Sequence, residues 1–253
     1  MSGALPGRHI VITGAANGIG RACVERFLAE GARIGGIDRD AAGLAALAAT
    51  IGPERFHAAV ADVGEPIQVE AAIAACAAAL GGIDGLVCAA GIDLVRPLEQ
   101  MVTAEWCRIL DVNLTGPMLA AQACYPYLRA AGGGTVVTVS SGAGLSPLKH
   151  RSAYCASKAG LPMFTKALAM EAAAFGIRVN AVCPGAVETD LLRSGLASMS
   201  DPEAAREEVK ARYALARIAA PAEIANAILW LTSSESSYVT GTAMAVDGGR
   251  TFH

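Results

Sequence analysis

Charge is scarce in this chain. Lys, Arg, Asp and Glu together make up 17% of its 253 residues, the formal net charge is −3, and there is no long run of basic residues. Proteins that bind nucleic acid use Lys and Arg to neutralise phosphates, so the composition argues against a nucleic-acid partner. Aromatic residues are also few, at 5%. Alanine, glycine and β-branched residues must therefore fill any core.

Signals for a membrane, a disulfide or a metal are missing as well. Residues 1–9 form no hydrophobic signal segment, and the alanine-rich run 71–80 is too short to span a bilayer. The seven cysteines are odd in number and form no Cys-x-x-Cys pair, and the histidines lack the spacing of metal ligands. We therefore expect a cytoplasmic protein with reduced cysteines, no metal and no membrane association.

What the sequence does contain is a regular alternation of apolar, β-branched runs with alanine-rich helical stretches. The expected strands are residues 8–13, 33–38, 56–62, 84–89, 134–140, 178–182 and 242–246. The expected helices are 18–30, 40–50, 66–80, 103–130, 152–175, 190–197 with 202–214, and 221–233. This pattern predicts an α/β, doubly wound (Rossmann) fold with a seven-stranded parallel sheet and helices on both faces. No linker divides residues 1–253, which favours a single domain.

A glycine-rich turn follows the first expected strand and precedes a helix. Its sequence, residues 13–20, is Thr-Gly-Ala-Ala-Asn-Gly-Ile-Gly. Glycines here permit a tight turn and close approach to a pyrophosphate, and the helix N-terminus supplies amide donors. The second strand ends at Asp38, whose carboxylate can bind an adenosine ribose and would repel a 2′-phosphate. Residues 15–17 include no Arg or Lys. Although Arg39 could reach a phosphate, we favour NAD over NADP.

Tyr154 and Lys158 are one helical turn apart, and Ser141 precedes Tyr154 by thirteen residues. A tyrosine and a lysine at i and i+4 share one helix face, so both can point into one site. An ammonium group beside a phenol is expected to lower the phenol pKa from about 10. This arrangement predicts a metal-free acid and base near neutral pH.

Together these motifs resemble the short-chain dehydrogenase/reductase family over nearly the whole chain. The matching positions are Thr13 to Gly20, Asp62-Val63, Asn113, Ser141, Tyr154 with Lys158, Pro184 to Thr189, and Val246 to Gly249. The resemblance implies an NAD-dependent interconversion of a secondary alcohol and a ketone, with Asn113, Ser141, Tyr154 and Lys158 as catalytic residues. It implies cofactor contacts from Gly14, Asn17, Gly18, Ile19, Gly20, Asp38, Arg39, Asp62, Val63, Ala89, Gly91, Tyr154, Lys158, Pro184, Gly185, Val187 and Thr189.

The chain departs from the family at one motif, where the family's Asn-Asn-Ala-Gly is replaced by Cys88-Ala89-Ala90-Gly91. In the family this motif contacts the cofactor largely through backbone atoms, so Ala89 and Gly91 can still make these contacts.

Pro117 stands four residues after Asn113 and lacks an N–H, so the Asn113 carbonyl is expected to lose its helical partner. The resemblance implies that this carbonyl holds a water that relays protons to Lys158. A merely kinked helix is the alternative.

Substrate contacts are less strongly indicated. Lys149, His150 and Arg151 form either a solvated loop or subunit contact, or a pocket edge where His150 or Arg151 meets a polar or anionic substrate. The helical segment 188–214, which includes Arg193, is expected to be a lid over the substrate. Ser141 and Tyr154 would hold the substrate oxygen.

The long apolar helices 103–130 and 152–175 favour burial against another subunit. The resemblance implies a homotetramer, with strand 242–246 and the tail to His253 near a second interface. Two other functions remain open: an NADPH-dependent ketoreductase of the 3-oxoacyl type, and a non-catalytic dinucleotide sensor or scaffold.

Overall fold

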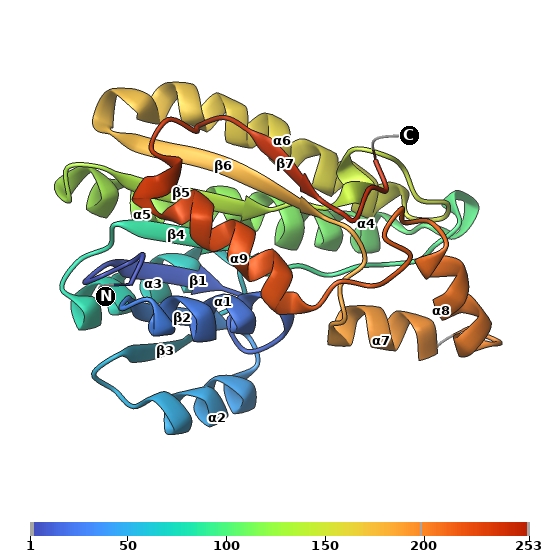
Figure 1. The fold of residues 1–253 in the computed structure, drawn as a ribbon, viewed down its shortest axis with the longest axis horizontal. Coiled ribbons are helices and arrows are strands. Elements are labelled where there is room, and N and C mark those ends of the chain that lie inside the picture. The colour runs from blue at the N-terminus through green and yellow to red at the C-terminus, as the bar shows by residue number, and fades with distance from the viewer. Residues whose placement is uncertain (1–2, 198, 252–253) are drawn as a thin grey trace.

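The computed structural model describes residues 3–197 and 199–251, so the tail residue His253 lies outside it. Its centre is a seven-stranded, all-parallel sheet with the order β3-β2-β1-β4-β5-β6-β7 (Figure 1). The strands are β1 (His9–Thr13), β2 (Arg33–Asp38), β3 (Phe56–Val60), β4 (Gly85–Cys88), β5 (Gly134–Val139), β6 (Ile177–Pro184) and β7 (Ala243–Val246). This is the predicted doubly wound, single-domain α/β fold.

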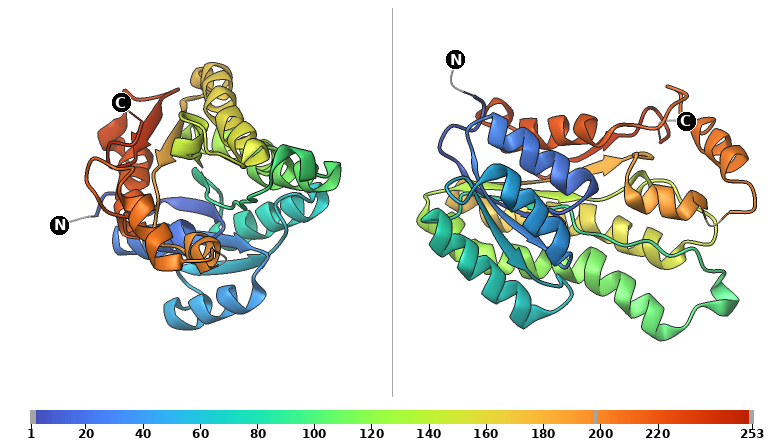
Figure 2. Two further views of the ribbon diagram at one scale, coloured as in Figure 1. Left: turned by 90° about the vertical axis from the view of Figure 1, so that its right-hand side faces the viewer. Right: turned by 90° about the horizontal axis from the view of Figure 1, so that it is seen from below.

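Helices cover both faces of the sheet (Figure 2). They are α1 (Gly18–Ala29), α2 (Ala41–Ile51), α3 (Pro66–Leu80), α4 (Thr103–Leu110), α5 (Gly116–Ala130), α6 (Ser152–Ala172), α7 (Asp190–Ala197), α8 (Pro202–Lys210) and α9 (Pro221–Thr232). None of the helices in the described ranges is both long and apolar enough to cross a membrane.

Two apolar cores form because side chains alternate between the faces of a strand. In β1, Ile10 and Ile12 belong to the core that includes Phe27 of α1. Val11, between them, belongs to the opposite core, with Ile73 of α3. Both faces of the central strands are thus buried, which explains their continuous apolar sequences.

The expected helix 103–130 is divided in the structure. Between α4 and α5 lies a π-helical segment, Asp111–Thr115, in which the N–H of Gly116 reaches the carbonyl of Asp111. Pro117 follows directly and cannot donate a backbone hydrogen bond. A wider turn in front of the proline therefore divides the expected continuous helix, and π segments of this kind are frequent at functional sites.

The order of the strands reverses at β1. The chain runs outward from β1 through β2 to β3 and then returns to place β4 on the other side of β1. A crevice forms at such a reversal, beyond the carboxyl ends of the strands, and ligands of open α/β sheets bind there. Helices α7 and α8 stand beyond this same edge (Figure 1).

Candidate active site

A cavity of about 850 Å³ opens at the carboxyl edge of the sheet. Its wall contains nearly all the residues that the sequence indicated. They are Gly14, Asn17, Gly18, Ile19, Asp38, Arg39, Asp62, Val63, Ala89, Gly91, Ser141, His150, Arg151, Tyr154, Lys158, Pro184, Gly185, Val187 and Thr189. Gly20, Asn113 and Arg193 do not line it.

The glycine turn has the geometry that a dinucleotide requires. Gly14 and Gly18 have φ angles of 72° and 55°, in the left-handed region that glycine tolerates best. A Cβ on Gly20 would lie 1.9 Å from the carbonyl oxygen of Gly14, so α1 packs against the turn as only glycine allows. The first turn of α1 contains no acidic residue. Its free amides and positive end are therefore suited to a pyrophosphate.

Two acidic side chains, Asp38 and Asp40, lie beside the glycine turn. The carboxylate of Asp38 accepts hydrogen bonds from the backbone N–H groups of Ala16 and Asp40, each at 3.0 Å. Asp40 in turn accepts one from the side-chain amide of Asn17, also at 3.0 Å. The turn after β1 and the end of β2 are thus held together by carboxylates.

Asp62 forms an ion pair with Arg108 of α4, a residue that the sequence analysis did not select. Burial disfavours the charge of Asp62, but the hydrogen bonds from Arg108 and from the N–H of Gly64 outweigh it, and the pKa of Asp62 is lowered. The charge of Arg39 acts on Asp62 in the same direction. The charge of Arg108 is therefore balanced by Asp62 within the protein.

Tyr154 and Lys158 point into the cavity from α6, and Ser141 lies at the end of β5. The Ser141 hydroxyl accepts a hydrogen bond from the N–H of Ala143 at 3.0 Å. The hydroxyl of the neighbouring Ser140 instead donates to the backbone carbonyl of Lys158 at 2.6 Å and is buried. Of the two serines, Ser141 is the one beside Tyr154.

The expectation that Lys158 lowers the pKa of Tyr154 is wrong for this state of the protein. Burial raises the pKa of Tyr154 to about 12, and the interaction with Ser141 opposes this only in part. Lys158 lies 5.9 Å from the centre of the Tyr154 ring and donates instead to the carbonyl of Val139 at 2.9 Å. Burial lowers the pKa of Lys158 to about 8.

Asn113 is fully buried behind the cavity, in the π-helical segment. Its Oδ1 accepts from the N–H of Ile92 and its Nδ2 donates to the carbonyl of Ile92, both at 2.9 Å. Nδ2 also donates to the hydroxyl of Ser157, at 3.1 Å. The expected role of its backbone carbonyl stays a prediction; what the structure shows is a side chain that joins the loop after β4 to α6.

The segment after β6 lines the cavity and reaches the glycine turn after β1. A Cβ on Gly185 would lie 2.6 Å from Cε1 of Tyr213, and one on Gly18 would lie 3.1 Å from Cγ2 of Thr189. The hydroxyl of Tyr213 accepts a hydrogen bond from the N–H of Ala186 at 2.8 Å. This contact ties the end of the 188–214 segment to the residues that line the cavity, and no motif in the sequence predicted it.

Arg193 was expected to contact the substrate, but it does not line the cavity. Its guanidinium pairs with Asp190 at 2.7 Å and Glu188 at 3.6 Å, and its side chain is 54% exposed. An arginine at helix position i+3 from an aspartate finds this local partner readily. Arg193 is thus a surface residue of α7 and not a substrate contact in this conformation.

Arg151 does line the cavity, but it has a partner that the sequence analysis missed. Its Nε lies 3.2 Å from Oδ2 of Asp93. His150, beside it, has a φ angle of 60°, and its carbonyl accepts from the N–H of Arg96 at 2.7 Å. Asp93 follows the end of β4 by five residues, and its position beyond the carboxyl end of a central parallel strand could have marked it.

Comparison with known proteins agrees with this geometry. A family model described as Enoyl-(Acyl carrier protein) reductase matches residues 14–251. D-threitol dehydrogenase from Mycolicibacterium smegmatis is 38% identical over 249 residues, covering 98% of this chain and 94% of that protein. The 3-oxoacyl-[acyl-carrier-protein] reductase FabG from Thermotoga maritima is 37% identical over 247 residues, covering 97% and 98%.

The fold has a similarly close match. The crystal structure of a short-chain dehydrogenase/reductase, "Glucose/ribitol dehydrogenase", from Brucella melitensis superposes with a TM-score of 0.90 at 35% identity, covering 99% of each chain. The chain belongs to the short-chain dehydrogenase/reductase family. It is an oxidoreductase of a family that binds a nicotinamide dinucleotide.

The burial of Tyr154 leads to a spectroscopic prediction for the protein without cofactor. A pKa of about 12 means that Tyr154 stays protonated across the neutral and mildly alkaline range. We expect the difference in tyrosinate absorbance between wild type and Tyr154→Phe to stay near zero up to about pH 10. A tyrosinate signal from Tyr154 near neutral pH, without cofactor, would contradict the raised pKa.

Proposed function

We propose that this protein is an NAD-dependent dehydrogenase that interconverts a secondary alcohol and a ketone. The observation that carries the proposal is the meeting of Ser141, Tyr154 and Lys158 with the glycine turn in one cavity. The three residues supply hydrogen-bonding and acid–base groups, and the turn supplies a place for the dinucleotide. The bound nicotinamide supplies the chemistry that the side chains lack, by accepting a hydride in one direction and giving it back in the other.

Each side chain has a separate task. Ser141 holds the substrate oxygen by a hydrogen bond. Tyr154 takes the hydroxyl proton during oxidation and returns it to the alkoxide oxygen during reduction. Lys158 is the cation closest to Tyr154 on its helix, and its charge favours the phenolate when the two approach more closely than in this structure. Asn113 holds the loop that carries Gly91 against α6 and thereby positions Lys158.

We assign the glycine turn and α1 to the pyrophosphate, Asp38 to the adenosine ribose, and the Asp62–Val63 pair to the adenine. Ala89 and Gly91 line the middle of the site, and the 184–189 segment lies on the nicotinamide side. Asp38 and Asp40 together make the ribose end acidic, which supports NAD over NADP. The cysteines in the described ranges are free thiols, which supports a cytoplasmic enzyme.

We assign the 188–214 segment to a lid. Helices α7 and α8 stand over the cavity, and most of their length is exposed. Glu188 forms an ion pair with Arg206, which joins the start of the lid to α8. Movement of this segment would admit the substrate and then exclude water.

The D-threitol dehydrogenase relative supports an alcohol as substrate, and the 3-oxoacyl reductase relative keeps an NADPH-dependent ketoreductase as the second candidate. The two differ at the ribose end, where a carboxylate at Asp38 favours the first. A non-catalytic dinucleotide sensor on the same fold is the third, and the complete Ser141, Tyr154 and Lys158 set argues against it.

The first test is turnover of secondary alcohols with NAD, followed by NADH absorbance, in wild type and in Tyr154→Phe. The variant keeps the ring and loses only the hydroxyl, so we expect at least about a 100-fold loss of turnover with NAD binding largely retained. Lys158→Met should lose both turnover and cofactor affinity. Near-normal turnover in Tyr154→Phe would refute the role of the phenol, and no turnover on any alcohol or ketone would favour the sensor.

The second test concerns cofactor choice. Asp38→Ala removes the negative charge at the ribose end, so we expect weaker NAD binding and a ratio of kcat/KM for NAD over NADP that falls at least about tenfold, or about 1.4 kcal/mol. Asp38→Asn is the matched variant, because its amide oxygen can still accept from Ala16 or Asp40 while the charge is gone. A wild-type preference for NADP would instead make Arg39 the dominant group.

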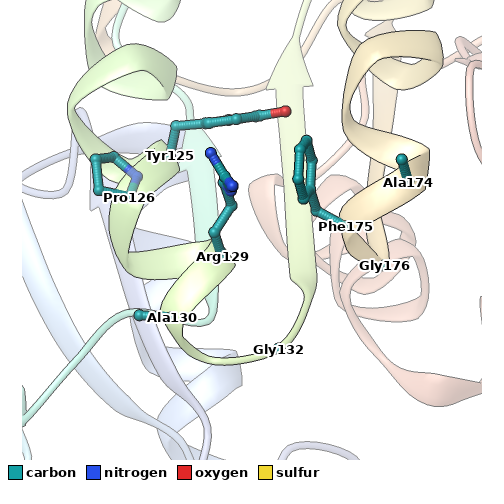
Figure 3. A pocket seen from close by; sticks show the side chains of 8 residues that line it. All are labelled: Tyr125, Pro126, Arg129, Ala130, Gly132, Ala174, Phe175 and Gly176. Atoms are coloured by element: carbon teal, nitrogen blue, oxygen red, sulfur yellow. The ribbon is translucent and has the colours of Figure 1, made fainter.

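A further part of the proposal is self-association through the face of α5 and α6. Met163 and Met170 lie seven residues apart on α6, and their exposed fractions are 66% and 84%. At one end of this face, Arg129 lies over Phe175 with Cζ 4.0 Å from the ring centre, and Tyr125 meets the same ring edge-on (Figure 3). Strand β7 lies at an edge of the sheet and offers a second contact surface.

These surfaces support a homotetramer, which light scattering can test. Replacing Met163 and Met170 together by Lys places two charges in the proposed interface, so we expect a smaller species than wild type at micromolar concentration. Ile67→Lys is a control, because Ile67 is similarly exposed, at 83%, but lies on α3 and not on the proposed contact helices α5 and α6. A monomeric wild type would contradict the assembly.

A further inference from the structure

The ion pair of Asp93 and Arg151 lies in the wall of the cavity beside Tyr154. Asp93 comes from the loop after β4, and Arg151 immediately precedes α6. Their charges act in opposite directions on the pKa of Tyr154, with Asp93 raising it and Arg151 lowering it. Both groups therefore lie near the phenol at which the substrate oxygen binds.

The pair is incompletely satisfied by the protein. Its closest approach joins Nε of Arg151 to Oδ2 of Asp93 at 3.2 Å, while Oδ1 of Asp93 accepts from the N–H of Leu94 at 2.8 Å. Within residues 3–197 and 199–251, the two Nη groups of Arg151 make no hydrogen bond. A guanidinium has five N–H donors and a carboxylate has about four acceptor positions, so both partners keep capacity for a ligand.

The two loops that carry the pair are held in place. Ile92, next to Asp93, is bonded through its N–H and its carbonyl to the buried amide of Asn113. The N–H of Arg96 donates to the carbonyl of His150, next to Arg151, at 2.7 Å. The backbone on either side of the pair is therefore held in place, which favours a recognition site.

The side chains of Asp93 and Arg151 are only 18% and 25% exposed. An apolar substrate against them would remove the remaining water without replacing its hydrogen bonds, which is unfavourable. An anionic substrate would meet the carboxylate of Asp93 beside the guanidinium. A neutral hydroxyl group is different, because it donates to the carboxylate and accepts from the guanidinium at the same time.

We propose that Asp93 and Arg151 together bind a second hydroxyl group of the substrate, so that the preferred substrates are neutral polyhydroxylated compounds such as polyols. The carbinol group that reacts lies at Ser141 and Tyr154, and a neighbouring hydroxyl lies at the ion pair. This inference rests on the proposed dehydrogenase function. From the sequence, Arg151 was expected to meet a polar or anionic group of the substrate, and the ion pair with Asp93 favours a neutral polar group.

The test compares butan-2-ol, butane-2,3-diol and 3-hydroxybutanoate as substrates with NAD. These have a similar short carbon chain and differ in having no second group, a hydroxyl, or a carboxylate. Wild type should prefer the diol. In Asp93→Ala we expect kcat/KM for the diol to fall roughly 10- to 150-fold, the scale of a lost hydrogen bond to a charged group, and by at least about tenfold more than for the mono-alcohol.

Asp93→Asn removes the charge and keeps the shape. Because it leaves Arg151 without a neighbouring carboxylate, we expect it to improve kcat/KM for 3-hydroxybutanoate while it weakens the diol. Glu235→Gln serves as the control, since Glu235 is an exposed carboxylate that does not line the cavity. It should leave all three values unchanged.

Two outcomes would overturn the proposal. Equal losses on mono-alcohol and diol in Asp93→Ala would make the ion pair a structural link only. A wild-type preference for 3-hydroxybutanoate that disappears in Arg151→Ala would make Arg151 an anion receptor.

A binding measurement separates these outcomes from a failure of the dehydrogenase function. Calorimetric titration of butane-2,3-diol and of threitol into the NADH-loaded protein measures binding without oxidation, because NADH cannot accept a hydride. Binding that weakens in Asp93→Ala supports the ion-pair site even if no alcohol is oxidised, whereas binding that is absent or independent of Asp93 refutes it.

Discussion

The arrangement of this site depends on the hydrogen bonds of the buried side-chain amide of Asn113. It bonds both backbone groups of Ile92 and the hydroxyl of Ser157, so one side chain joins the π-helical segment, the loop after β4 and helix α6. A buried amide without these partners would cost free energy, about 1–3 kcal/mol for each unsatisfied group. The same contacts fix Gly91 and Asp93 on one side and the start of α6, with Tyr154, on the other.

Without ligand, burial disfavours the charged forms of both Tyr154 and Lys158. Burial holds Tyr154 as a neutral phenol and lowers the pKa of Lys158, because each charged form would lack compensation in this low-dielectric wall. Lys158 meanwhile donates to the carbonyl of Val139. In the proposed function, acid–base catalysis near neutral pH would therefore require Lys158 to come closer to Tyr154, or the bound cofactor to change the charge beside the phenol.

The sequence was sufficient for the fold and for most of the cavity wall, because both are encoded locally. Each strand is a short apolar run, and the glycine turn and the Tyr154–Lys158 pair are defined by close spacing. It was insufficient where distant residues meet. The pairing of Asp93 with Arg151 joins residues 58 positions apart, and Asp62 pairs with Arg108, 46 positions away. The pairing of Arg193 with Asp190 is local, and the sequence analysis overlooked it. The split of helix 103–130 also escaped, since Pro117 indicates a disruption but not its form.

The π-helical segment has a consequence for how this chain tolerates change. A π turn holds one more residue than an α turn, and one residue of an α-helix corresponds to a rotation of about 100°. Deleting any one of residues 111–115 would allow a regular helix and turn the preceding helix relative to α5 by that angle. Arg108 of α4 would then no longer face Asp62. Natural length variation should therefore avoid these five positions, even though several of their side chains could be exchanged.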